Sequence, residues 1–223
     1  MKNLLFISLF LAGGLQMSAQ TQLAIDATEL NDNVNQAHGY KKTKYVAGTP
    51  YLNENNTIGT FYQKNKTIVK TPTKLNMYYN GFEYMVDEKT YLVNPSVIDS
   101  VSMNNETYVF KTFSVNGEKT PKVVKEIDKK GDNKLYVYKS VDLIPEVKPA
   151  GYVEPKPARF EWNDPVYVFD IKGQTILLKN FKSITDLFPK SENSIRKYIK
   201  ENHLRVNNEA NLKTLLGYIS QLK

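Results

Sequence analysis

The chain has 223 residues, no Cys and a formal net charge of +7 at pH 7. The lack of Cys excludes disulfides and thiolate metal sites, and a chain of this length can bury a sufficient core without them. Arg occurs only at positions 159, 196 and 205. Because the planar guanidinium group is favoured in nucleic-acid and phosphate recognition, we expect no nucleic-acid partner.

The N-terminal residues have the pattern of a secretory signal peptide. Residues 1–19 contain an early Lys, an apolar run at 4–12 and a small residue, Ala19, before the expected cleavage point. The apolar run is too short to span a bilayer, so we expect its removal, no transmembrane segment afterwards, and export. The lack of disulfides favours the periplasm over the extracellular space. Residues 20–47 are predicted to be weakly structured, with a short helix over 23–30.

Between residues 48 and 180, short runs of strand-forming residues alternate with turn residues. This pattern predicts an antiparallel sheet that folds as a sandwich, roll or partial barrel. The predicted strands cover residues 57–63, 67–69, 90–93, 97–103, 106–115, 122–127 and 135–141. Residues 166–179 are typical of a further hairpin with Gly173 near its turn.

The stretch MYYNGFEYMV, residues 77–86, predicts the most distinctive hairpin. Its Asn80-Gly81 pair is typical of a two-residue type I′ turn, which would place Leu75 opposite Val86. The face predicted to pack on a core contains Leu75, Met77, Tyr79, Phe82, Tyr84 and Val86. The opposite face contains Asn76, Tyr78, Glu83 and Met85. Tyr78 is therefore a candidate contact for a sugar or a partner, and the alternative that we favour is a ring that covers a neighbouring strand or loop.

A Pro-rich stretch occupies residues 144–165. Pro removes a backbone donor and fixes φ, so we expect an extended connection here and neither a central strand nor a helix. The stretch carries Tyr152, Arg159 and Trp162, the last being the only Trp of the chain. We expect it to lie as a strap across the β body, anchored by Trp162. In the alternative, it is an arm that offers these three side chains to a partner.

Helical periodicity begins at residue 181. Residues 181–188 start with a capping pattern, Ser183 followed by Asp186, and stop at Pro189. Two further helices are predicted from apolar positions at helical spacing, the last of them starting at an Asn cap. Their buried faces are expected to contain Ile195, Tyr198 and Ile199 in one helix, and Leu212, Leu215, Leu216, Ile219 and Leu222 in the other.

These patterns together predict an α+β protein, an antiparallel β body over 48–180 with a helical segment at 181–223. The alternative divides the chain into two domains at the Pro-rich stretch. We predict no catalytic, cofactor-binding or metal-binding residues, because the two His, His38 and His203, lie far apart in the sequence and no catalytic or phosphate-binding motif occurs.

A pair of carboxylates for glycoside hydrolysis could be drawn from Glu83, Asp87 and Glu88. The interpretation that we favour places Asp87 and Glu88 at a turn and Glu83 on the outer face of a strand.

Several segments resemble exported proteins of Bacteroidota to which no activity is assigned. They are GTPYLNENNTIGTFY, KLNMYYNGFEY, VIDSVSM and the C-terminal run from FKSITDLF to LGYISQL. The resemblance implies a signal peptide, a β-rich body and a helical end. We therefore expect a non-catalytic periplasmic or envelope-associated module that binds a protein, glycan or lipid. The alternatives are an envelope glycan hydrolase with paired carboxylates and a periplasmic carrier of lipid or lipoprotein.

Overall fold

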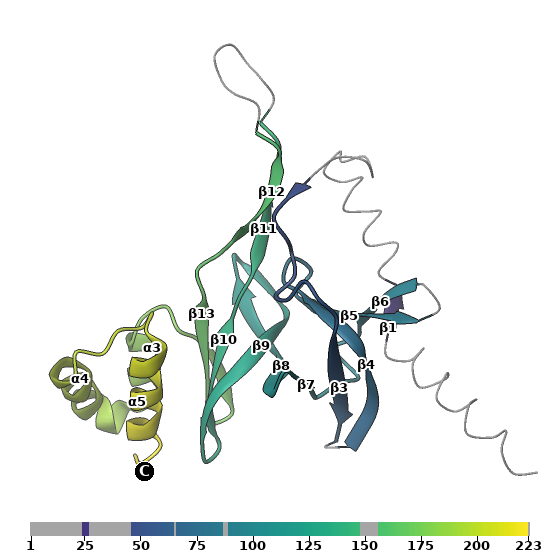
Figure 1. Cartoon of the computed structure of the whole chain (residues 1–223). Coiled ribbons are helices and arrows are strands. Elements are labelled where there is room, and N and C mark those ends of the chain that lie inside the picture. The colour runs from purple at the N-terminus through teal and green to yellow at the C-terminus, as the bar shows by residue number, and fades with distance from the viewer. Residues whose placement is uncertain (1–23, 27–45, 65, 87–88, 148–155, 223) are drawn as a thin grey trace, which may run out of the picture.

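A computed structural model describes residues 24–26, 46–64, 66–86, 89–147 and 156–222 of the chain. Within these residues, eleven strands form one continuous sheet, three strands form a small second sheet, and helices lie at the C-terminal end (Figure 1). The predicted α+β class, an antiparallel β body followed by a group of short helices, is confirmed.

Adjacent strands of the large sheet are all antiparallel. From one edge to the other, the sheet contains β1 (Ala24–Asp26), β6 (Lys89–Val93), β5 (Gly81–Val86), β4 (Lys66–Asn76), β3 (Thr57–Gln63), β7 (Ser100–Met103), β8 (Glu106–Val115), β9 (Glu118–Lys130), β10 (Asn133–Tyr138), β13 (Val166–Ile171) and β14 (Gln174–Leu177). Every strand predicted between residues 57 and 141 overlaps an observed strand. The hairpin predicted at 166–179 corresponds to β13 and β14.

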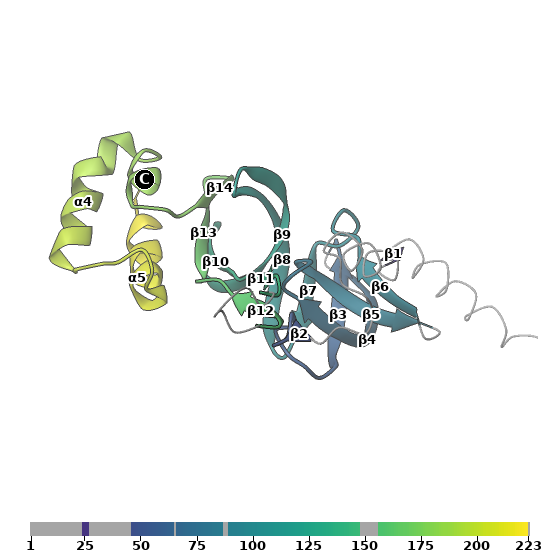
Figure 2. The ribbon, with the colours of Figure 1, turned by 90° about the horizontal axis from the view of Figure 1, so that it is seen from above.

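The second half of the sheet curls into a roll. Seen from above, β8, β9, β10, β13 and β14 follow one another around a ring, and β14 returns to lie near β8 (Figure 2). The register between β9 and β10 shifts at Leu135 and Tyr136, which marks a β-bulge and increases the local twist. Buried side chains fill the inside of the roll, namely Phe113, Val124, Tyr136, Tyr138 and Val168. The inside of the roll is therefore a packed core and not an open channel.

The alternation of side chains along β8 assigns its two faces to two different cores. Phe113 faces the inside of the roll, whereas Tyr108 packs with buried residues from the first half of the sheet. The ring centroid of Phe82 lies 5.7 Å from that of Tyr108 and 6.0 Å from that of Phe61, both edge to face. The contact between Phe82 and Tyr108 joins the two halves of the sheet.

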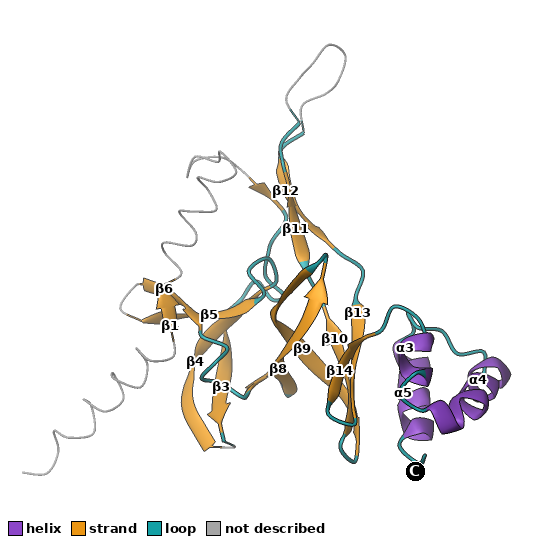
Figure 3. Ribbon diagram, turned by 180° about the vertical axis from the view of Figure 1, so that it is seen from behind, coloured by secondary structure: helices purple, strands orange, loops and turns teal. Residues whose placement is uncertain are grey.

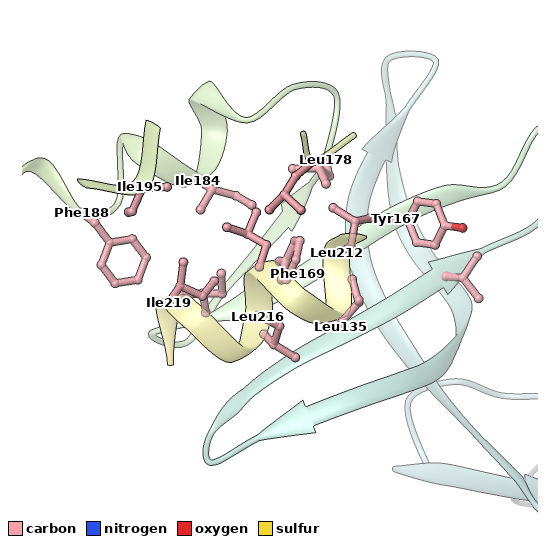
Figure 4. Packing of buried hydrophobic residues seen from close by; sticks show 14 residues of the cluster. Leu135, Tyr167, Phe169, Leu178, Ile184, Phe188, Ile195, Leu212, Leu216 and Ile219 are labelled. Carbon is pink, nitrogen blue, oxygen red and sulfur yellow. The ribbon is translucent and has the colours of Figure 1, made fainter. Parts of the chain in front are cut away.

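Helices cover the outer face of β10 and β13 (Figure 3). They are α3 (Lys182–Thr185), the 3₁₀ turn η1 (Pro189–Ser191), α4 (Glu192–Glu201) and α5 (Glu209–Ile219). Asn208 caps α5, because its side chain accepts the N–H of Asn211 at 3.0 Å. The predicted apolar stripe of α5 packs on Leu135 and Phe169 (Figure 4). This confirms the burial of Leu212, Leu215, Leu216 and Ile219, and Ile195 of α4 is buried as well.

The capping pattern predicted for the first helix is wrong. Phe181 occupies the N-cap of α3, without a side-chain cap, and Ser183 Oγ donates to the carbonyl of Asn180 at 2.8 Å. Asp186 lies beyond the end of α3 and pairs with Lys182 at 2.7 Å. A four-residue helix places the two predicted capping partners at opposite ends, so they cannot form a capping box.

The turn predicted at Asn80-Gly81 is also wrong. Leu75 pairs with Phe82 and Asn76 with Gly81, so residues 77–80 form a longer connection. Asn80 has a φ of 54°, but Gly81 lies within β5. A Cβ at position 81 would come within 2.7 Å of Leu92 Cδ1, so the close approach of Leu92 is what Gly81 permits. The register shift is by an even number of residues, so Leu75, Phe82 and Tyr84 still face the core as predicted.

Near the N-terminus, residues 24–26 form β1 and pair with β6, so the helix expected over 23–30 is wrong at these positions. The proposed signal peptide and most of residues 20–47, including His38, lie outside the described residues. Among the helices of the described part of the chain, none has the length and apolar character required to span a membrane.

The Pro-rich stretch contributes a strand, contrary to expectation. The small sheet has the order β11 (Val141–Ile144), β12 (Ala158–Trp162) and β2 (Val46–Ala47), with β12 at its centre. Pro157 and Pro165 flank β12, so no Pro interrupts its hydrogen bonds. Figure 1 shows β11 and β12 as an arm that extends away from the main sheet.

Candidate functional site

A cavity of about 340 Å³ lies between the end of β4, the β7–β8 turn and the strands β8, β9 and β10. We call it the main pocket. Its apolar walls are formed by Leu52, Leu75, Met77, Tyr108, Val123 and Val137, and its polar lining by Asn53, Asn104, Glu106, Lys125 and Lys139. The lining is thus shared about equally between apolar side chains and charged or amide groups, so it offers contacts both to the apolar body and to the polar group of a small molecule.

Strand register creates the back wall of the main pocket. Lys125 of β9 lies opposite Tyr108 of β8 on one side and Val137 of β10 on the other. These three side chains therefore form one row across three strands, on the face that points away from the inside of the roll. Val123 lies two residues from Lys125 on the same face and extends the apolar part of the wall.

Glu106 is the only carboxylate of the pocket lining in the described part of the chain. It accepts a hydrogen bond from Lys125 Nζ at 2.8 Å and another from Tyr108 Oη at 2.5 Å. Partial burial alone would raise the pKa of Glu106, but these two bonds and the charges of Lys125 and Lys139 outweigh it and lower the pKa. Burial, followed by the bond to Glu106, raises the pKa of Tyr108 well above its usual range.

A short segment, residues 49–53, forms the wall opposite the strands. Its backbone is held against the end of β4 by two hydrogen bonds, from Leu52 N to Leu75 O at 2.9 Å and from Met77 N to Pro50 O at 2.7 Å. These bonds place Leu52 and Asn53 at the pocket. The 49–53 segment therefore determines the shape of one side of the cavity.

Tyr51 fastens the 49–53 segment to the hairpin. Its hydroxyl donates to Glu83 Oε2 at 3.0 Å, and Asn76 Nδ2 donates to Glu83 Oε1 at 2.7 Å. Burial, and then the charge of Glu83, raise the pKa of Tyr51 far above its ordinary value. We call this set of three side chains the Glu83 clamp. A smaller hollow of about 120 Å³ beside it is lined by Tyr51, Lys74 and Glu83, among others.

The clamp corrects the prediction for Glu83. We expected it on the outer face of the strand, and on that face the side chain is buried, with 5% of its surface exposed. The 49–53 segment covers that face of the hairpin, which the local sequence does not show. Asp87 and Glu88, the other carboxylates of the hydrolase alternative, lie outside the described residues.

Of the predicted partner contacts, Tyr78 is half-buried. Its ring centroid lies 5.7 Å from that of Phe160 in β12 and 5.3 Å from that of Tyr79. This arrangement agrees with the favoured alternative, a ring that covers a neighbouring strand. Arg159 forms an ion pair with Glu161 at 2.9 Å. Tyr152 lies outside the described residues.

Trp162 does not anchor the arm as expected, because 42% of its surface is exposed. Phe160, two residues earlier on β12, instead packs against the core of the first half of the sheet. Neither Trp162 nor Arg159 is among the described residues that line the main pocket. The predicted contacts Arg159 and Trp162 therefore lie outside the main pocket.

Sequence reasoning missed the polar groups of the main pocket. Glu106, Tyr108, Lys125 and Lys139 come from different strands and from the residue after β10, and only the strand register brings them together. In the described part of the chain, no three His, Asp or Glu side chains form a group that could hold a metal ion. No family model, curated protein or solved structure matches this chain.

Proposed function

We propose that the protein is an exported, non-catalytic module that binds a small molecule with an apolar body in the main pocket. The observation that carries this proposal is the cavity itself. Its volume of about 340 Å³ falls in the range of roughly 300–1,000 Å³ for small-molecule sites. The signal-peptide pattern of residues 1–19 and the resemblance to exported Bacteroidota proteins support export.

The chemistry of the lining supports binding better than catalysis. Glu106 already accepts hydrogen bonds from Lys125 and Tyr108, and its lowered pKa makes it a poor proton donor near neutral pH. Glycoside hydrolysis requires a second carboxylate at a set distance from the first. Among the described residues the pocket offers Glu106 alone, so the hydrolase alternative finds no support here.

Methyl-resolved NMR tests the proposal. The neutral probe 1-octanol is titrated into protein with labelled Leu, Val and Met methyl groups. The expected shifts concentrate on Leu52, Leu75, Met77, Val123 and Val137, which line the cavity. The proposal fails if these methyl signals stay in place at saturating probe.

The control variant is Leu52→Trp. Leu52 is half-buried on the 49–53 segment, so a larger side chain there fills the cavity from its edge and leaves the strands unchanged. We expect this variant to keep its melting temperature within a few degrees and to lose the octanol-induced shifts. Equal shifts in the wild type and in Leu52→Trp would show that the probe binds elsewhere.

A further inference from the structure

The charges around the main pocket do not balance. Glu106 and Lys125 form an ion pair at 2.8 Å and so largely neutralise each other. Lys139 also lines the pocket, and in the described part of the chain no carboxylate lies within ion-pairing distance of its ammonium group. One positive charge of the lining is therefore left over at the cavity.

Lys139 is held in position by the fold. It follows the last residue of β10 directly and lies two residues after Val137, which forms part of the apolar wall. The residue is half-buried and lines the pocket. A lysine in such a place commonly lays its methylene groups along apolar surface and keeps its ammonium group in contact with water. A partly buried ammonium group gains free energy from an anionic partner.

The same lining disfavours a cationic ligand. Both oxygens of Glu106 already accept hydrogen bonds, one from Lys125 and one from Tyr108. The other polar groups in the lining are the neutral amides of Asn53 and Asn104. A ligand ammonium group would therefore meet two lysines and a carboxylate that already accepts two hydrogen bonds. A ligand carboxylate would meet Lys139, which forms no ion pair within the described part of the chain.

From this charge distribution we infer that the ligand of the main pocket is an amphipathic monoanion, with an apolar chain or ring inside the cavity and a single acidic group against Lys139. This inference rests on the proposed function, because it names the class of ligand for the same site. A carboxylate of medium chain length satisfies both requirements. Lys139 is among the causes that lower the pKa of Glu106, after the bonds and charge of Lys125 and the bond of Tyr108, so its positive charge acts on the pocket lining.

Three probes with the same alkyl chain separate the inference from the proposed function. Octanoate, 1-octanol and octylamine are titrated at pH 7 by the methyl NMR assay, at low and at high salt. We expect octanoate to bind about tenfold more tightly than octylamine, which corresponds to one charge-assisted interaction. Added salt should weaken octanoate binding and leave octanol binding unchanged.

Substitution of Lys139 completes the test. Lys139→Met should weaken octanoate about tenfold without effect on octanol, and Lys139→Arg should keep the octanoate affinity. Lys179→Met, at an exposed lysine outside the pocket, is the matched control and should change nothing. Equal affinity for octanoate and octylamine, or an unchanged octanoate affinity in Lys139→Met, overturns the anion assignment while octanol binding still supports the pocket. If none of the three probes moves the pocket methyl groups, the proposed function fails as well.

Discussion

Removal of one hydroxyl group from the Glu83 clamp should loosen the wall of the main pocket. Tyr51→Phe deletes the Oη that donates to Glu83 Oε2 at 3.0 Å, which leaves Asn76 Nδ2 as the hydrogen-bond donor to the buried carboxylate among the described residues. A hydrogen bond to a charged group contributes about 1.5–3 kcal/mol. Because Tyr51 is half-buried and water can replace part of the bond, we expect a loss of about 1.5 kcal/mol, or about 3–6 °C in melting temperature.

Urea unfolding followed by circular dichroism measures this loss. The matched control is Tyr62→Phe, since Tyr62 is also half-buried but makes no side-chain hydrogen bond that the described residues show. It should stay within about 0.5 kcal/mol of the wild type.

In a Glu83→Gln background the charge is absent, so loss of the Tyr51 hydroxyl should cost only about 0.5–1 kcal/mol. An equal cost in both backgrounds, or a Tyr51→Phe variant as stable as the control, would refute the clamp. Because Leu52 and Asn53 follow Tyr51 directly, Tyr51→Phe should also weaken octanol binding.

Four further outcomes follow from the packing and the titration of individual residues. Leu215→Ala should cost about 2–5 kcal/mol in urea unfolding, since Leu215 is fully buried on the inner face of α5, while Thr214→Ala on the exposed face of that helix should change little. Trp162→Ala should cost less than about 1 kcal/mol, and the emission of this single, 42% exposed Trp should be readily quenched by iodide. Because the pKa of Glu106 is lowered in the folded state, the unfolded state binds more protons in acid. The contribution of Glu106 to stability is therefore present above about pH 4.3 and is lost as the pH falls through the folded pKa. Glu106→Gln should flatten the dependence of stability on pH in this acid range. Burial, and then the charge of Glu83, raise the pKa of Tyr79 to about 12, so the contribution of Tyr79 to stability is complete below about pH 10 and is lost as the pH rises toward 12. Absorbance at the phenolate band should show tyrosines that ionise only above the ordinary pKa of the side chain. Titration of all tyrosines at the ordinary pKa would contradict their burial.

Local patterns in the sequence predicted the periodic elements well and the turns unevenly. The Asn-Gly pair at 116–117 forms a tight turn with φ values of 53° and 86°, between the partners Val115 and Glu118. The same pair at 80–81 does not. Asn80 Oδ1 accepts the N–H of Val123 in β9, and Asn76 Oδ1 accepts the N–H groups of Tyr78 and Tyr79 within the longer connection. Contacts distant in sequence thus override the turn preference.

The candidate site could not be predicted from the sequence for a related reason. Alternation along β8 indicates that Glu106 and Tyr108 share a face, but only the register with β9 shows that Lys125 lies opposite Tyr108. Glu83 was assigned to the correct face of its strand, yet its burial depends on the 49–53 segment, whose path no local pattern specifies. The expectation that Trp162 anchors the Pro-rich stretch rested on residue type alone, and it is wrong because Phe160 is the aromatic residue that packs on the core.

The central claim, that the main pocket holds a small ligand, is tested most directly by native mass spectrometry of protein purified from its own cells. We expect a population of the wild type to carry a small amphipathic acid, identified by its mass after gentle release. Leu52→Trp, purified in the same way, should carry none, because its cavity is filled. Wild-type protein without a bound small molecule, or an equal bound mass in Leu52→Trp, would contradict a ligand in the main pocket.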